Sequence, residues 1–127
     1  MTKEEAIRLG DLQLQIMKVL WRLGRATVAE VHQQLDGDPL AYTTVATMLR
    51  KMEDRGLVSH EEESRKFIYL PAISSDAVAR SMTDDFLNRI FEGSLASAVD
   101  HLLQARDVSA SELAELAELI RNRSKRR

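Results

Sequence analysis

The hydrophobic pattern of this chain changes its period once, and that change limits the folds that the chain can adopt. Before Gly56 the apolar residues recur at the spacing of a helix. Three helices are predicted there, at residues 11–23, about 28–35 and about 42–55. After Gly56, segments 57–60 and 66–70 are typical of strands, and the charged stretch 61–65 joins them as a polar tip. The sequence therefore predicts a mainly α fold with a small β-hairpin.

Three helices followed by a hairpin is the element order of a winged helix-turn-helix. After Pro71 the chain is helical again, at about 75–92, at about 95–104 and from the capping-box pattern Ser109–Glu112 onward. Such short helices would form a marginal core alone, so we expect self-association to cover them. The residues predicted to form that dimer interface are Phe86, Ile90, Leu95, Val99, Leu102, Leu103, Leu113, Leu116 and Ile120.

The amino-acid composition excludes several kinds of site and gives no direct sign of nucleic-acid binding. The 127 residues include no Cys, which excludes a disulfide framework, a thiolate metal site and a Cys nucleophile. No apolar run approaches the ~18 residues of a membrane span, and the N-terminus lacks a signal-peptide core, so we expect a cytoplasmic protein without membrane insertion. With 18 basic and 20 acidic residues, the chain lacks the global basicity of many nucleic-acid binders. Any DNA-binding role must therefore depend on where the charges lie.

Catalytic patterns are missing from the sequence. The three histidines, His32, His60 and His101, lie on different predicted elements without metal-ligand spacing. Asp84 and Asp85 are adjacent, so on a helix they point about 100° apart and cannot form a dyad. We expect no enzymatic activity, no cofactor and no metal.

The third predicted helix has an outward face that suits DNA. In a helix-turn-helix the second helix presents its N-terminal residues to base edges. Thr43, Thr44 and Thr47 fit that place, because a threonine hydroxyl can donate or accept and its methyl can pack on the thymine methyl group. Arg50 and Lys51, further along, suit phosphates. The alternative is a solvated helix surface, where β-branched residues are locally poor helix formers.

The predicted hairpin tip carries Arg65 and Lys66 beside the acidic triplet 61–63. As a functional group, Arg65 would reach a phosphate or the minor groove, as basic arms do. The alternative is a solvated turn whose charges pair locally. The sequence pattern leaves both open.

Several strings resemble the penicillinase-repressor (BlaI/MecI) family. They are LAYTTVATML at 40–49, GLV at 56–58, RKFIY at 65–69, IMKVLW at 16–21 and ATV at 26–28. The resemblance covers nearly the whole chain, and the string around Tyr42–Val45 is far more specific than a generic helix-turn-helix match.

The resemblance implies a homodimeric repressor whose N-terminal winged helix binds a palindromic operator and whose C-terminal helices form the dimer. It places Thr43, Thr44 and Thr47 in the recognition helix and Arg65 in the wing. It also implies control of β-lactamase or cell-wall stress genes, hence a role in antibiotic resistance.

Three departures from the family pattern concern regulation and the wing. Ser64 stands in the wing turn where the family commonly has Gly. The copper-responsive branch has a Cys-rich tail, and this chain has no Cys. In penicillinase repressors a membrane sensor protease cuts an Asn-Phe bond in the fifth helix, and the matching dipeptide here is His101-Leu102.

We therefore predict a DNA-binding winged helix-turn-helix domain at 1–72 and a helical dimerisation domain at 73–127. The predicted function is sequence-specific transcriptional repression on double-stranded DNA. The alternative is a helical adaptor whose winged helix binds protein.

Overall fold

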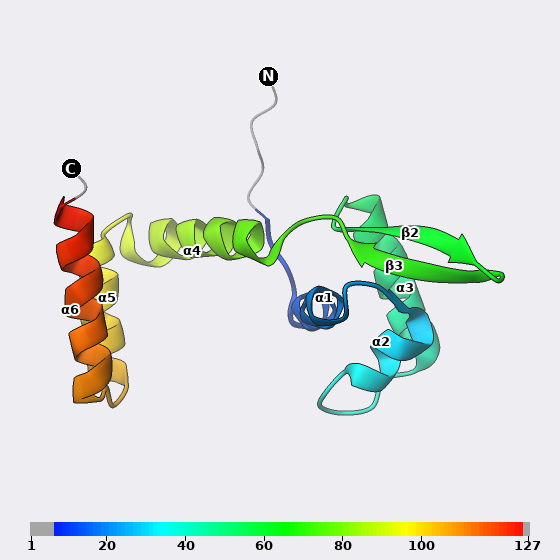
Figure 1. Ribbon diagram of the computed structural model, residues 1–127, viewed down its shortest axis with the longest axis horizontal. Helices are drawn as coiled ribbons and strands as arrows, with labels where there is room; N and C mark the ends of the chain where they lie inside the picture. The colour runs from blue at the N-terminus through cyan, green and yellow to red at the C-terminus, as the bar shows by residue number, and fades with distance from the viewer. Residues whose placement is uncertain (1–6, 126–127) are drawn as a thin grey trace, which may run out of the picture. The chain divides into compact units, whose positions relative to one another are not determined.

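The computed structural model describes residues 7–125 and divides into two compact units, one ending at Asp85 and one beginning at Phe86. The elements of the first unit are α1 (Asp11–Leu23), β1 (Ala26–Thr27), α2 (Val28–Gln34), α3 (Tyr42–Asp54), β2 (Val58–Glu63) and β3 (Lys66–Pro71) (Figure 1). The division falls inside α4 (Ser75–Phe91). The second unit continues with α5 (Leu95–Ala105) and α6 (Ala110–Lys125). The predicted class, mainly α with a small β wing, is confirmed.

Local signals set the ends of the first helices. The Thr27 side chain accepts a hydrogen bond from the Glu30 backbone N–H at 3.1 Å, and the Glu30 carboxylate accepts one from the Thr27 N–H at 2.8 Å. This reciprocal capping box starts α2 where the sequence predicted it. Gly24 ends α1 at φ 85°, a left-handed conformation that costs glycine little because it has no Cβ.

The wing is longer and better paired than the sequence predicted. Residues 61–63 are not a loop: they continue β2 and pair with β3, from Glu61 opposite Ile68 to Glu63 opposite Lys66. Only Ser64 and Arg65 form the turn. A third strand, β1, pairs with the outer side of β3, so the hairpin is part of a three-stranded antiparallel sheet.

One hydrophobic core holds α1, α2, α3 and the sheet together. Its largest fully buried side chains are Tyr69, Ile16, Met17, Leu20, Leu49, Met52, Val31 and Val45. Trp21 lies at the edge of this core, and its indole N–H donates to the Ile73 carbonyl at 2.9 Å. The core therefore fixes α3 against the base of the wing.

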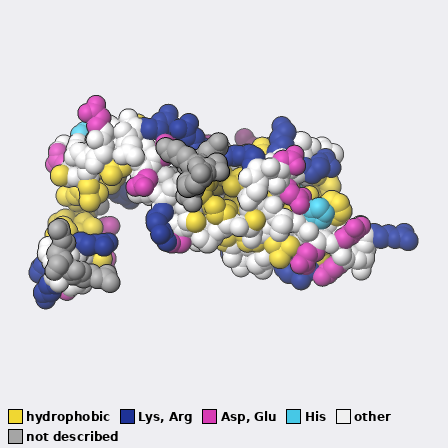
Figure 2. All heavy atoms as spheres, turned by 90° about the horizontal axis from the view of Figure 1, so that it is seen from above, with side chains coloured by type: hydrophobic (Ala, Val, Ile, Leu, Met, Phe, Trp, Pro, Cys, Tyr) yellow, Lys and Arg dark blue, Asp and Glu magenta, His cyan; other side chains and the backbone are white. Residues whose placement is uncertain are grey.

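The second unit keeps much of its apolar surface in contact with solvent. Ala98 is its buried hydrophobic residue, and Leu116 is half-buried. The large apolar side chains exposed in this unit are Phe86, Ile90, Leu95, Val99, Leu102, Leu103, Leu113, Leu119 and Ile120. Figure 2 shows hydrophobic side chains at the surface of this part of the chain. Among residues 7–125, no helix is both long and apolar enough to cross a membrane.

Candidate nucleic-acid interface

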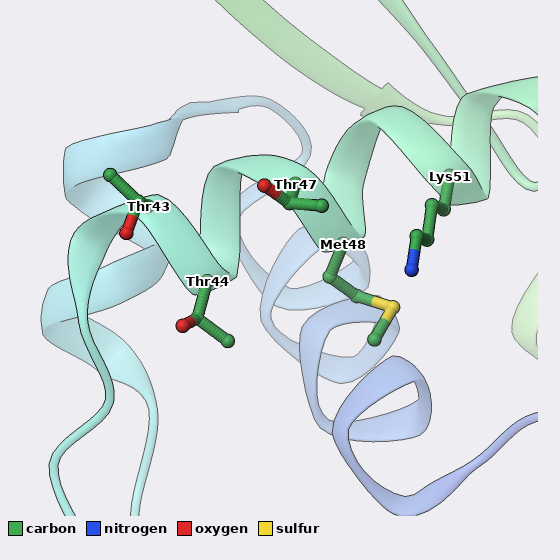
Figure 3. Close-up of a pocket in the computed structure, with 5 residues that line it drawn as sticks. All are labelled: Thr43, Thr44, Thr47, Met48 and Lys51. Atoms are coloured by element: carbon green, nitrogen blue, oxygen red, sulfur yellow. The ribbon is translucent and has the colours of Figure 1, made fainter.

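The outward face of α3 carries the residues that the sequence predicted for DNA contact. Val45, Leu49 and Met52 bury one side of the helix in the core, and this fixes which side faces out. The threonines Thr43, Thr44 and Thr47 are all exposed. Together with Met48 and Lys51 they line a shallow hollow along the helix (Figure 3).

The chemistry of this surface changes along α3. Hydroxyls and methyls lie at its N-terminal end, and the cationic Lys51 lies more than one turn later. This order matches a helix whose start meets base edges and whose later turns meet phosphates. Within residues 7–125, neither Arg50 nor Lys51 has an ion-pair partner, so both charges are available to a ligand.

A histidine links the end of α3 to the wing. The Nδ1–H of His60, on β2, donates to the Glu53 carboxylate, with oxygens at 2.7 and 2.8 Å. The imidazole is stacked on the Phe67 ring of β3, with 4.1 Å between centroids and 15° between planes. Because this β2 side chain contacts both α3 and β3, it restricts the orientation of the wing relative to α3.

The tip of the wing presents two basic residues at a tight turn. Ser64 and Arg65 have φ values of 50° and 68°, the left-handed pair of a tight two-residue hairpin turn. Arg65 and Lys66 are exposed, and in the described part of the chain neither makes an ion pair. Figure 2 shows basic atoms projecting at the wing tip, beyond the acidic ones. Among the described residues, these two cations do not pair with the acidic residues of the wing.

The acidic strand of the wing is partly neutralised from outside the hairpin. Arg25, just before β1, lies 2.5 Å from a Glu63 carboxylate oxygen and 3.9 Å from one of Glu61. The hydrogen bond to Glu63 and the Glu63 charge are the main causes that raise the pKa of Arg25 above its usual value. This pairing lowers the negative charge that β2 would present to a polyanion.

A second hollow brings α3 and the wing together. Tyr42 and Arg50 of α3 line it with Arg65, Lys66 and Tyr69 of the turn and β3. The predicted DNA-contact residues thus form two neighbouring groups, one along α3 and one between α3 and the wing. The two tyrosines were missed from sequence, because nothing in their spacing shows that positions 42 and 69 share one surface.

Comparison with known proteins identifies the family. The sequence profile described as "Penicillinase repressor" matches residues 9–122. The chain belongs to the penicillinase repressor family. A curated "Penicillinase repressor" from Bacillus licheniformis is 29% identical over 121 residues, covering 94% of each chain. "Transcriptional regulator BlaI" from Mycobacterium tuberculosis is 36% identical over 100 residues, covering 76% of this chain and 72% of that one.

A solved structure agrees with this family assignment. The solution structure of the DNA binding domain of the repressor BlaI matches with a TM-score of 0.50 and 28% identity. The match covers 59% of this chain and 93% of that domain. The predicted winged-helix fold is therefore confirmed for the part of the chain that this match covers.

The regulatory dipeptide predicted from the penicillinase repressor resemblance lies within α5. His101 donates from Nδ1 to the Ser97 carbonyl at 3.0 Å, and its ring lies 5.2 Å from that of Phe91. Leu102 is half exposed, among the apolar residues predicted for the dimer. Among the described residues, no group of His, Asp or Glu is arranged to hold a metal ion.

Proposed function

We propose that this chain is a transcriptional repressor that binds a palindromic operator in double-stranded DNA as a homodimer. The observation that carries the proposal is the exposed threonine and cation surface of α3, next to a wing whose basic tip makes no ion pair within residues 7–125. The solved structure that matches 59% of this chain is named the DNA binding domain of the repressor BlaI, which supports the same function here. The family relatives include regulators of methicillin resistance, which supports target genes of the β-lactam response.

The proposed roles follow the chemistry of each residue. Thr43, Thr44 and Thr47 read base edges in the major groove. Arg50 and Lys51 hold phosphates beside that groove, and Arg65 and Lys66 bind the backbone or minor groove from the wing. In this scheme base contacts give the sequence preference and cations give most of the affinity.

The proposed dimer assigns 1–72 to DNA binding and 73–127 to dimerisation. The exposed apolar residues of α4, α5 and α6 support this, because such a surface on a small protein is typical of an interface. One winged helix spans only a short half-site. A dimer joins two such contacts at a fixed spacing of about one helical turn, and tethering supplies a high effective concentration for the second.

Relief of repression is proposed to occur by proteolysis of the His101–Leu102 bond by a membrane sensor protease. The bond lies among the apolar residues of α5, so cleavage would divide the proposed interface. Loss of the dimer would then release each half-site, by the tethering argument.

In-vitro selection of duplex DNA with the purified full-length protein tests the function. We expect enrichment of a palindromic sequence and an affinity that falls steeply with salt, by about 0.9 log units per log unit of salt for each phosphate contact. An adaptor that binds protein would enrich no sequence and show no salt-dependent binding to duplex DNA. That outcome would reject the repressor.

A further inference from the structure

Tyr69 is a buried tyrosine whose hydroxyl makes no hydrogen bond to any described residue. The residue is only 2% exposed and belongs to the central core. Within residues 7–125 its hydroxyl makes no hydrogen bond, although buried polar groups nearly always do. The hydroxyl is not sealed in, because no side-chain oxygen or nitrogen of the described residues is both fully buried and unbonded. Its outlet is the hollow between α3 and the wing, which Tyr69 lines.

The charged groups around this hollow are all cations, set among apolar and hydroxyl side chains. Arg50 comes from α3, and Arg65 and Lys66 come from the wing, while no carboxylate of the described residues lines the hollow. Burial is the main cause that raises the pKa of Tyr69, the nearby Glu53 charge adds to it, and Arg50 opposes it. Tyr69 therefore stays protonated at neutral pH and remains a donor. The Glu53 carboxylate is occupied by His60.

We propose that this hollow binds one backbone phosphate of the DNA duplex, with the Tyr69 hydroxyl as a neutral donor and Arg50 as the neighbouring charge. The inference rests on the proposed function and deepens it, because it assigns a phosphate site that joins α3 to the wing. A phosphate held by both elements fixes the position of the wing along the duplex. It also explains why a core tyrosine carries a hydroxyl that residues 7–125 leave without a hydrogen bond.

A DNA phosphate fits this hollow better than a free anion does. The hollow is open and lies beside the exposed threonines, since Arg50 and Thr47 are three positions apart on the same helix. A duplex seated on those threonines therefore brings its own backbone to the hollow. Hydrogen bonds to charged groups are among the stronger ones, so one lost donor has a measurable effect.

The first test compares three full-length variants by fluorescence anisotropy on the selected operator. Tyr69→Phe keeps the ring and removes no hydrogen bond seen among the described residues, so we expect unchanged thermal stability and about tenfold weaker binding to every sequence. Arg50→Gln should weaken binding and flatten the salt slope by about one contact, whereas Tyr69→Phe leaves the slope unchanged because the hydroxyl is neutral. Arg80→Gln is the control: it removes an arginine that is paired with Asp76 on α4, and it should change neither the affinity for DNA nor the salt slope.

The second test locates the phosphate. Duplexes with one neutral methylphosphonate at each position in turn should reveal a phosphate whose neutralisation weakens the wild type about tenfold but Tyr69→Phe much less. Equal losses at all positions for both proteins would overturn the site, as would wild-type affinity of Tyr69→Phe. Competition by inorganic phosphate, at constant ionic strength, that Tyr69→Phe abolishes would instead assign the hollow to a free anion. If the wild type bound no duplex at all, the proposed function itself would fail, a result distinct from each of these.

Discussion

At the scale of single residues, the exposed threonines at the start of α3 suit DNA recognition better than they suit helix stability. Threonine is a poor helix former because its branched Cβ restricts χ1. Yet Thr43, Thr44 and Thr47 occupy exposed positions of α3, where packing does not require them. Such a local cost is expected at sites kept for binding.

Replacing Thr47 with Ala should therefore act in opposite directions on stability and on recognition. We expect the free energy of unfolding to rise by a few tenths of a kcal/mol, because Ala is the better helix former. Binding to the preferred site should weaken by about 1–3 kcal/mol, with relaxed sequence preference. Thr83→Ala, an exposed threonine of α4, is the matched control and should affect stability alone. Unchanged affinity and an unchanged selected sequence would show that α3 does not read bases.

The raised pKa of Tyr69 gives stability a dependence on alkaline pH. In the unfolded chain Tyr69 ionises near its ordinary pKa of 10.0, and in the folded protein at higher pH, chiefly because of burial. Below about pH 10 its contribution is fully present, and it is lost as the pH rises through the folded pKa, since only the unfolded chain has released its proton. Urea unfolding between about pH 8 and about pH 11 should show wild type losing stability relative to Tyr69→Phe. Parallel curves for the two proteins would contradict this.

At the scale of elements, agreement between sequence and structure followed the strength of each local signal. The helix at 11–23 was predicted with the bounds of α1, because two apolar faces repeat over its whole length. β1 was missed, since two residues are too short to show an alternation. Residues 61–63 were predicted as a loop because three consecutive glutamates show none of the apolar alternation that marks a strand. Pairing with β3 makes them a strand.

The candidate site was predictable along one element and not between elements. The helical period placed Thr43, Thr47 and Arg50 on one exposed face, which the structure confirms. The hollow of Tyr42 and Tyr69 depends on how β3 returns past α3, a long-range contact that spacing does not encode.

The wing turn allows strain and charge to be separated. Ser64 and Arg65 both have positive φ, which disfavours residues with a Cβ. Arg65→Gly should raise the free energy of unfolding by up to about 1 kcal/mol, yet weaken DNA binding and lower the salt slope by about 0.9. Ser64→Gly relieves the same kind of strain and keeps the cation, so it should stabilise without changing affinity. Thermal unfolding and anisotropy at several salt concentrations measure both effects. If both glycine variants bound DNA alike, Arg65 would have no role in binding.

At the scale of the whole molecule, the exposed apolar residues of α5 and α6 are the proposed dimer interface, and a charge placed among them tests it. Leu102→Asp would place an unpaired charge in the proposed interface, where burial is costly. We expect a monomer in sedimentation experiments and loss of most operator affinity, with the winged-helix unit still folded. Ala96→Asp adds the same charge to another position of α5, near its N-terminus, where a carboxylate is favourable. The Ala96→Asp protein should remain dimeric. If the Leu102→Asp protein were also dimeric, the interface would lie elsewhere.

The same helix determines how cleavage could end repression. A protease binds an extended segment, but the His101–Leu102 bond lies inside α5, between its N-cap Ser94 and its C-cap Arg106. Cleavage therefore requires local opening of α5, and a dimer that covers Leu102 should slow it. When producing cells are exposed to a cell-wall antibiotic, intact-mass analysis should show a fragment ending at His101 as target genes switch on. Restoring the family dipeptide with His101→Asn and Leu102→Phe should speed its appearance, since a site shaped for Asn-Phe discriminates against other side chains. An intact chain during induction would show that a different signal acts on the dimer.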